Sequence, residues 1–225
     1  SPEQERITRR LVARASRLMV MCQSGRDLLV ARFGASADRV CVIEHGAPDR
    51  PLELDRASGA GRTLMTFGLI GPGKGLETAI KALPAIVARH PDTKYRIAGA
   101  SHPNEVRRNG ETYRCSLEEL AGRLGVSNHI EWVDRFLDNE ELLDLIGGSD
   151  IYLTPYPNLQ QSTSGTLSYA VALGRAVIST PYIHARELLG DIGGVLVPPN
   201  DAAAIAREVN RLLDDAGQLA ALQLR

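Results

Sequence analysis

The chain has 225 residues, of which 44% are apolar and 24% are charged, so it can bury a core as one or two globular domains. The formal net charge is −1, with acidic and basic residues interspersed, which argues against a nucleic acid or an anionic membrane as the main partner. The sequence shows no apolar run near the roughly 18 residues of a membrane span and no signal peptide, so any membrane contact is expected to be peripheral.

Helices and strands alternate in the first part of the chain. We expect a charged helix over residues 2–16, a buried strand over 18–22, a helix capped by Ser24 that runs to about Phe33, and a second buried strand over 39–43. Such a piece cannot form a sheet core alone, so residues 1–46 are expected to be the tail of a preceding domain that is missing here. The proline- and glycine-rich residues 47–62 are expected to be a linker.

From residue 63 to residue 225 the alternation restarts without an internal repeat. Strands are expected at residues 64–67, 94–98, 130–133, 151–153, 176–178 and 194–197, and helices at about 76–89, 117–124, 139–146, 164–173, 185–189 and from 202. This pattern predicts an α/β fold, a Rossmann-like doubly wound parallel sheet with helices on both faces. In such a sheet, ligands bind at the carboxyl ends of the strands.

Cysteine and histidine residues do not indicate a disulfide framework or a metal site. Cys22, Cys41 and Cys115 are odd in number and widely spaced, and their mostly apolar surroundings predict buried thiols in a reducing cytoplasm. The five histidines do not show metal-ligand spacing, and His90 and His129 are expected at the surface. We therefore expect neither a metal nor a cofactor.

A glycine-rich turn follows the first strand of the segment 63–225. Residues 68–75 read Gly-Leu-Ile-Gly-Pro-Gly-Lys-Gly and lead into a helix. Glycines allow backbone N–H groups to approach an anion, while the helix N-terminus and Lys74 supply positive potential. The turn therefore predicts a phosphate-bearing ligand; a tight strand-to-helix turn with a solvated lysine is the alternative.

Three kinds of phosphate site can be compared with this turn. The spacing of Gly68, Gly73 and Lys74 approaches a nucleoside triphosphatase loop, but Gly75 stands where a Ser or Thr hydroxyl would bind Mg²⁺. A dinucleotide fingerprint is disfavoured because the helix begins too soon, at Leu76. The third kind is a nucleoside diphosphate sugar site, in which the turn and the lysine neutralise a diphosphate leaving group and a second loop holds the sugar.

A candidate second loop lies at residues 160–166, after the strand at 151–153 and directly before a helix. Its sequence, Gln-Gln-Ser-Thr-Ser-Gly-Thr, places small hydroxyl residues and a glycine at a helix start, where backbone N–H groups suit phosphate or sugar hydroxyls. Taken alone, Ser164 is equally compatible with a simple helix cap. Because both turns follow strands of one expected sheet, we favour a shared site.

Four segments, taken in order, resemble the motifs of a known family. Residues 43–48 (Ile-Glu-His-Gly-Ala-Pro) resemble its Pro-Asn-Gly or Pro-His-Gly turn, residues 68–75 its Gly-Arg-Leu and Lys-Gly pair, residues 169–178 its Glu-Ala-Met-Ala-x-Gly-x-Pro-Val-Ile segment, and residues 194–201 its closing motif. The family is the large group-one family of retaining glycosyltransferases, whose two-lobed architecture is called GT-B. The resemblance extends from about residue 10 and likens residues 63–225 to the C-terminal, donor-binding lobe.

The resemblance and the two turns together predict the site residues. Lys74 is implied as the catalytic residue, which stabilises the departing diphosphate. The donor-binding residues are expected to be Gly71, Gly73, Gly75, His102, Arg135, Phe136, Gln161, Thr163, Ser164, Gly165, Thr166, Tyr169 and Glu187. Three of these are equally compatible with a structural role: a solvated loop for His102, an ion pair with Asp138 or Glu140 for Arg135, and a helix cap or surface position for Glu187.

The sequence departs from the family at three charged positions. Leu69 stands where the family has the arginine of the first turn, and Gln161 and Tyr169 stand where it has two glutamates, which typically contact the donor sugar and the ribose. Leaving-group stabilisation is therefore expected to be weaker, or to be supplied elsewhere. The form around Gln161 resembles a bacterial subgroup without the paired glutamates, which also shares the segments found here at residues 110–114 and 179–182.

The resemblance implies transfer of a sugar from a nucleoside diphosphate sugar to an unknown acceptor, without a metal or cofactor. As isolated, the chain is expected to bind the donor weakly and to turn over little, because most of the N-terminal lobe that would hold the acceptor is missing. Two rival interpretations stay open. One is a noncatalytic sugar-nucleotide-binding module that lost its charged residues, and the other is a GT-B epimerase or phosphorylase.

Overall fold

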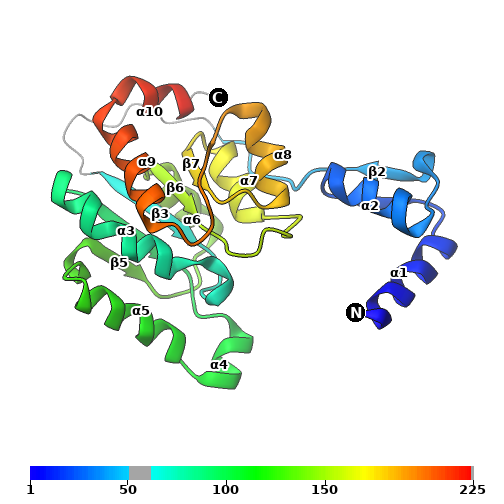
Figure 1. Cartoon of the computed structure of the whole chain (residues 1–225), viewed down its shortest axis with the longest axis horizontal. Coiled ribbons are helices and arrows are strands. Elements are labelled where there is room, and N and C mark those ends of the chain that lie inside the picture. The colour runs from blue at the N-terminus through cyan, green and yellow to red at the C-terminus, as the bar shows by residue number, and fades with distance from the viewer. Residues whose placement is uncertain (51–61, 224–225) are drawn as a thin grey trace.

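The computed structural model describes residues 1–50 and 62–223 of the chain. Most of the linker expected at residues 47–62 lies outside these residues. Within the described part, the strands form a two-stranded parallel sheet near the N-terminus, the small sheet, and a six-stranded parallel sheet, the large sheet. In that same part, no helix combines the length and the apolarity that a membrane crossing requires. Figure 1 shows the N-terminal segment to one side of the large sheet and its helices.

The N-terminal segment contains helix α1 (Pro2–Arg14), strand β1 (Leu18–Val20), helix α2 (Gln23–Phe33) and strand β2 (Val40–Val42). The expectation that both strands are buried is wrong: Met19 is 54% exposed, because a two-stranded sheet leaves much of its surface uncovered. The cap expected at Ser24 is also wrong, because the Sγ of Cys22 accepts the hydrogen bond from the Gly25 N–H instead. The small core of this segment joins Val12, Ala35 and Val40.

The large sheet contains β3 (Thr63–Phe67), β4 (Lys94–Ala98), β5 (Ile130–Val133), β6 (Ile151–Thr154), β7 (Ala176–Ser179) and β8 (Val195–Leu196). Neighbouring strands pair in parallel, in the order β5-β4-β3-β6-β7-β8. The chain builds one side of the sheet from β3 to β5 and then returns to build the other side from β6. The strand order therefore reverses between β3 and β6, and such a switch point opens a crevice at the carboxyl ends of the strands.

Helices cover both faces of the large sheet. One face carries α3 (Leu76–Arg89), α5 (Thr112–Arg123) and α9 (Ala202–Asp214), which Figure 1 shows together in front of the strands. The other face carries α6 (Asn139–Gly147), α7 (Gly165–Ala172) and α8 (Ile183–Ile192). Leu64 of β3 belongs to the first core and its neighbour Met65 to the second, as the alternation of side chains along a strand requires. The expected α/β fold with a doubly wound parallel sheet is confirmed.

Two helices of the structure were not expected, α4 (Pro103–Asn109) and α10 (Ala216–Gln223), and α5 begins earlier than the expected residue 117. Helix α4 has no buried residue, so it shows no apolar period in the sequence. It begins instead from local capping, because His102 Nδ1 accepts a hydrogen bond from the Asn104 N–H at 3.1 Å. Such a helix depends on its cap and not on burial.

Three expectations about the exposure of cysteines and histidines are wrong. Cys22 is buried, but Cys41 and Cys115 are exposed, on the small sheet and on α5. His90 was expected at the surface and is buried, because it ends α3 where that helix packs on α9. Its Nε2 lies 3.3 Å from the Asp214 carboxylate.

Candidate functional site

The turn after β3 folds back, so that the Lys74 side chain lies against Gly68 at the end of that strand. Gly68 has φ +121°, and a Cβ there would lie 2.9 Å from Lys74 Nζ, so both the backbone and the lysine favour glycine. A 3₁₀ turn (Pro72–Lys74) then leads to Gly75, which has φ +65°. A Cβ at Gly75 would lie 2.1 Å from the carbonyl oxygen of Pro155, in the loop after β6. The glycine-rich turn is therefore built closely against that loop.

A chain of hydrogen bonds joins the two turns. Lys74 Nζ donates to the Tyr156 hydroxyl at 2.9 Å, and that hydroxyl pairs with the Thr166 hydroxyl at 2.8 Å. The Thr166 hydroxyl is in turn 3.1 Å from Ser164 Oγ, which caps α7 by accepting from the Leu167 N–H. Ser164 is therefore both a helix cap and a member of the network that reaches the first turn.

Both turns border a hollow of about 370 Å³ beyond the carboxyl ends of β3, β4 and β6. It is lined by Leu69, Gly71, Pro72, Gly73, Lys74, His102, Asn104, Glu105, Tyr156 and Gln161. Lys74 is the only lysine or arginine among these described lining residues. The wall thus offers an ammonium group, an imidazole and backbone that glycine leaves accessible, which suits an anion flanked by hydroxyl groups.

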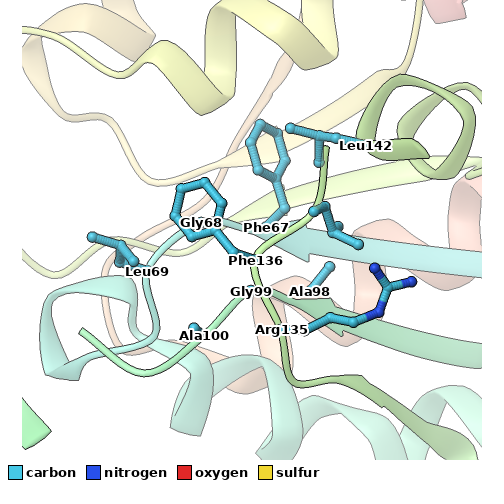
Figure 2. Close-up of a pocket in the computed structure, with 10 residues that line it drawn as sticks. Phe67, Gly68, Leu69, Ala98, Gly99, Ala100, Arg135, Phe136 and Leu142 are labelled. Carbon is cyan, nitrogen blue, oxygen red and sulfur yellow. The ribbon is translucent and has the colours of Figure 1, made fainter. Parts of the chain in front are cut away.

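An apolar slot of about 180 Å³ adjoins the hollow and shares Leu69 with it. Figure 2 shows its lining at the ends of β3, β4 and β5, made of Phe67, Gly68, Leu69, Ala98, Gly99, Ala100, Arg135, Phe136, Leu137 and Leu142. Gly99 has φ +128°, and a Cβ there would lie 2.3 Å from the Gly68 carbonyl oxygen, so the two strand ends touch. Phe136 is 84% exposed, and an aromatic ring at the mouth of an apolar slot suits a planar ligand.

Arg135 contributes to the slot while its charge is paired elsewhere. Its guanidinium forms two hydrogen bonds with Glu141, one of them at 2.6 Å, and not with Asp138 or Glu140 as the sequence suggested. Asp138 instead caps α6 by accepting from the Glu141 N–H at 2.9 Å. In Figure 2 the guanidinium points away from Leu69, so the charge of Arg135 is not directed at the hollow.

Two histidines order the second loop. His184 is buried, and its Nδ1 accepts from the Ser164 N–H at 2.9 Å. Burial lowers the pKa of His184 below its ordinary value, which favours the neutral ring that this hydrogen bond requires. A Cβ at Gly165 would lie 2.8 Å from Nε2 of His45, so a ring from the N-terminal segment packs on the start of α7. The sequence analysis assigned neither histidine to the site.

Gln161 and Tyr169, which the sequence analysis likened to two family glutamates, are both uncharged. Gln161 lines the hollow, and its Nε2 donates to the carbonyl oxygen of Thr163 at 3.0 Å. The Tyr169 ring lies 6.1 Å from the ring of Phe67, which lines the slot. One position therefore borders the hollow and the other borders the slot, and both offer hydrogen bonds without a charge.

Glu187 is not found in the lining of the hollow or the slot. Its carboxylate caps the start of α2, where it accepts from the Gln23 N–H at 2.8 Å, from the Ser24 N–H at 2.9 Å and from the Ser24 hydroxyl. Burial raises the pKa of Glu187, but the hydrogen bonds from Ser24 and Gln23 lower the pKa by more, so it lies below its ordinary value. The structure thus places Glu187 at a helix cap, the structural role that the sequence left open beside donor binding.

Most of the residues expected to bind the donor come together at one edge of the large sheet. Gly71, Gly73, Lys74, His102 and Gln161 line the hollow, Arg135 and Phe136 line the slot, Ser164 and Thr166 reach Lys74 through Tyr156, and Gly75, Thr163, Gly165 and Tyr169 lie behind these walls. The sequence analysis missed Tyr156. Its place directly after a strand of the same edge was a usable indication.

A model of the family described as glycosyl transferases group 1 matches residues 61–215, which include both turns and both cavities. The chain belongs to this family. Among its relatives, this group 1 chain is 31% identical over 169 residues to a phosphatidyl-myo-inositol mannosyltransferase of Mycolicibacterium smegmatis, covering 74% of the chain and 40% of that protein. It is 30% identical over 228 residues to a D-inositol 3-phosphate glycosyltransferase of Corynebacterium glutamicum, covering 91% of the chain and 50% of that protein.

Solved structures of other glycosyltransferases share the GT-B fold of this group 1 chain. HepE of Anabaena, in complex with UDP, superposes with a TM-score of 0.79 at 19% identity, over 99% of this chain and 62% of that one. WaaG, a glycosyltransferase of lipopolysaccharide biosynthesis, superposes with a TM-score of 0.71 at 18% identity, over 92% and 56%. The group 1 chain spans about half or less of the length of the curated relatives described above.

Proposed function

We propose that the protein transfers a sugar from a nucleoside diphosphate sugar to an acceptor hydroxyl, with retention of anomeric configuration, and that residues 63–225 bind the donor. The observation that carries this proposal is the position of Lys74 Nζ, which joins both turns on the wall of a hollow that adjoins an apolar slot. A diphosphate suits the hollow and a planar base suits the slot. The relatives support the proposal because they are glycosyltransferases, and HepE has been solved with UDP and with UDP-glucose.

In the proposed complex, each part of the donor meets a matching surface. The base lies in the slot against Phe136 and the backbone near Arg135, and the ribose lies near Tyr169. The diphosphate lies on the glycine-rich turn formed by Gly71, Gly73, Lys74 and Gly75. The sugar faces His102, Gln161 and the second loop, formed by Thr163, Ser164, Gly165 and Thr166.

In the proposed reaction, the bond between the anomeric carbon and the diphosphate stretches and negative charge builds on the phosphate oxygens. Lys74 and backbone N–H groups of the first turn stabilise this charge, and each donor contributes a few kcal/mol at most, as oxyanion donors do in other enzymes. The acceptor hydroxyl attacks from the face that the diphosphate leaves, and the departing phosphate takes the hydroxyl proton. This scheme uses neither a metal nor a cofactor.

The proposal also covers the rest of the chain. Residues 1–46 form the tail of the acceptor-binding lobe, residues 47–62 link it to the donor-binding domain, and the Glu187 contact with α2 joins the two parts. The chain alone is expected to bind the donor weakly and to turn over little. A cytoplasmic location stays an expectation from the sequence.

A second candidate function is a noncatalytic module that binds sugar nucleotides. The observation that favours it is the loss of charge at Leu69, Gln161 and Tyr169, where the sequence departs from the family. Such a module would keep the hollow and the slot but would stabilise a leaving diphosphate less. The two functions differ in turnover and not in nucleotide affinity.

Calorimetric titration of the chain with UDP, GDP and ADP tests the proposed donor site. We expect at least one of them to bind, and Lys74→Ala to lower its affinity by about tenfold or more. Lys81→Ala is the matched control, because Lys81 is exposed on α3, outside the hollow, and its loss is expected to leave the affinity unchanged. If the wild-type chain binds none of the three, the proposed site is wrong.

Turnover separates the transferase from the noncatalytic module. The protein would be incubated with nucleoside diphosphate sugars, and release of the nucleoside diphosphate would be followed. We expect release that falls about 100-fold or more in Lys74→Ala. Tight binding without any release would favour the noncatalytic module.

A further inference from the structure

Tyr156 lies in the loop after β6 and lines the hollow beside Lys74, but the proposed donor site has so far assigned it no role. Its side chain is buried, with 1% of its surface exposed. Its ring stacks on Tyr182 at 5.2 Å with an interplanar angle of 17°, and its carbonyl oxygen accepts from the Thr180 hydroxyl at 2.6 Å. Residues 179–182, a segment noted in the sequence without a function, therefore hold Tyr156 in one orientation.

The hydrogen bond between Lys74 and Tyr156 has a fixed direction. An ammonium group only donates, so the Tyr156 oxygen accepts from Lys74. The Tyr156 hydroxyl also pairs with the Thr166 hydroxyl, which in turn pairs with Ser164 Oγ, and in both pairs either oxygen can be the donor. The orientation of the Tyr156 hydroxyl is thus set from both sides, by Lys74 and by the second loop.

The ammonium group of Lys74 keeps capacity for a ligand in this arrangement. The bond to Tyr156 uses one of its three N–H donors. The close approach of Lys74 to Gly68 on the other side restricts where the ammonium group can go. Because Lys74 is the only lysine or arginine among the described residues that line the hollow, a diphosphate there depends on the placement of this one ammonium group.

We propose that Tyr156 is a positioning residue for Lys74, and that the hydroxyls of Tyr156, Thr166 and Ser164 hold the ammonium group in its diphosphate-binding position before the ligand arrives. A lysine side chain is long and flexible, so immobilising it during binding lowers the affinity. Immobilisation in the free protein removes part of this loss. The inference rests on the proposed donor site and explains how that site could bind a diphosphate with Lys74 as its cationic side chain.

The first test is Tyr156→Phe, which keeps the stack on Tyr182 and removes the hydroxyl that Lys74 contacts. The chain would be titrated with UDP, GDP and ADP, and with the nucleoside of the diphosphate that binds most tightly. We expect affinity for the diphosphate to fall about tenfold and affinity for the nucleoside to stay unchanged, because a nucleoside has no phosphate for Lys74. A general loss of structure would weaken both.

Tyr95→Phe is the matched control for this substitution. The Tyr95 side chain is also buried, and its hydroxyl also pairs with a threonine hydroxyl, that of Thr66, at 2.8 Å. It belongs to the core on the α3 side of the large sheet, whereas Tyr156 belongs to the core on the α7 side. We expect Tyr95→Phe to leave both affinities unchanged.

The second test repeats Tyr156→Phe in a Lys74→Ala background. If Tyr156 acts through Lys74, the double variant binds the diphosphate as weakly as Lys74→Ala alone. An undiminished further loss in that background overturns the positioning role, and so does wild-type affinity in Tyr156→Phe when Lys74→Ala weakens binding. Both results leave the proposed donor site standing, whereas a wild-type chain that binds none of the three diphosphates overturns both.

Thr166→Val provides an independent variant if Tyr156→Phe does not fold. It removes the hydroxyl that pairs with Tyr156 and keeps the branched shape of the side chain. We expect a smaller loss of diphosphate affinity, about threefold, with the affinity for the nucleoside unchanged. Equal affinity of Thr166→Val and wild type for the diphosphate would contradict the proposed network.

Discussion

Gly75→Ala is expected to destabilise the protein through a single added methyl group. Gly75 has φ +65°, where an L-residue other than glycine is disfavoured by about 1 kcal/mol. The new Cβ would also lie 2.1 Å from the Pro155 carbonyl oxygen, so the loop after β6 has to move away, and such overpacking typically costs about 1–3 kcal/mol. Together these effects lower the free energy of unfolding by about 3 kcal/mol, which lowers the melting temperature by about 6–12 °C.

Urea and thermal unfolding of Gly75→Ala measure this loss directly. Gly73→Ala, in the same turn, is the control, because a Cβ at Gly73 meets nothing within 4 Å. Its free energy of unfolding is expected to stay within about 1 kcal/mol of wild type. Equal stability of Gly75→Ala and wild type would refute the close packing of the two loops, and an equal loss in both variants would refute its assignment to Pro155.

Two further substitutions probe the joint to the N-terminal segment and the slot. Glu187→Gln removes the charge that caps α2, so we expect faster amide exchange at Gln23 and Ser24; protection that survives in full would contradict the cap. Because the pKa of Glu187 is lowered on folding, its contribution is present above the ordinary value of 4.5 and lost as the pH falls through the lower folded pKa, a dependence that the variant lacks. Phe136→Ala, at an 84% exposed position, is expected to change stability by less than about 0.5 kcal/mol. It should weaken binding of whichever nucleoside diphosphate binds, UDP, GDP or ADP, and of its nucleoside by a similar factor, about threefold to tenfold by calorimetry. A loss confined to the nucleoside diphosphate would contradict the placement of the base.

The large sheet was predicted closely because buried parallel strands are short apolar runs, which the sequence displays directly. The strand expected at 130–133 is found as β5 (Ile130–Val133). The small sheet was predicted to be buried, and this was wrong. The exposure of a residue such as Met19 depends on how many strands accompany its own strand, and not on its own apolar character. Helix α4 was missed because a cap at His102 starts it without an apolar face.

The candidate site was predicted where local backbone chemistry decides and missed where distant side chains meet. Gly68 and Gly75 were found from their spacing, and both adopt the left-handed conformations that make glycine necessary. Tyr156 was missed because its orientation comes from Tyr182 and Thr166, which the sequence does not place beside it. The sequence could not specify that Glu187 caps α2, because its partners belong to a helix near the other end of the chain.

The contact between Glu187 and the start of α2 joins groups that are 163 and 164 positions apart. Closing so long a loop consumes chain entropy before any hydrogen bond forms in return. We therefore expect this contact to form late during folding, after α2 and α8 already exist. For the same reason, it is expected to open early when the native protein begins to unfold, so that the N-terminal segment separates while the large sheet is still intact.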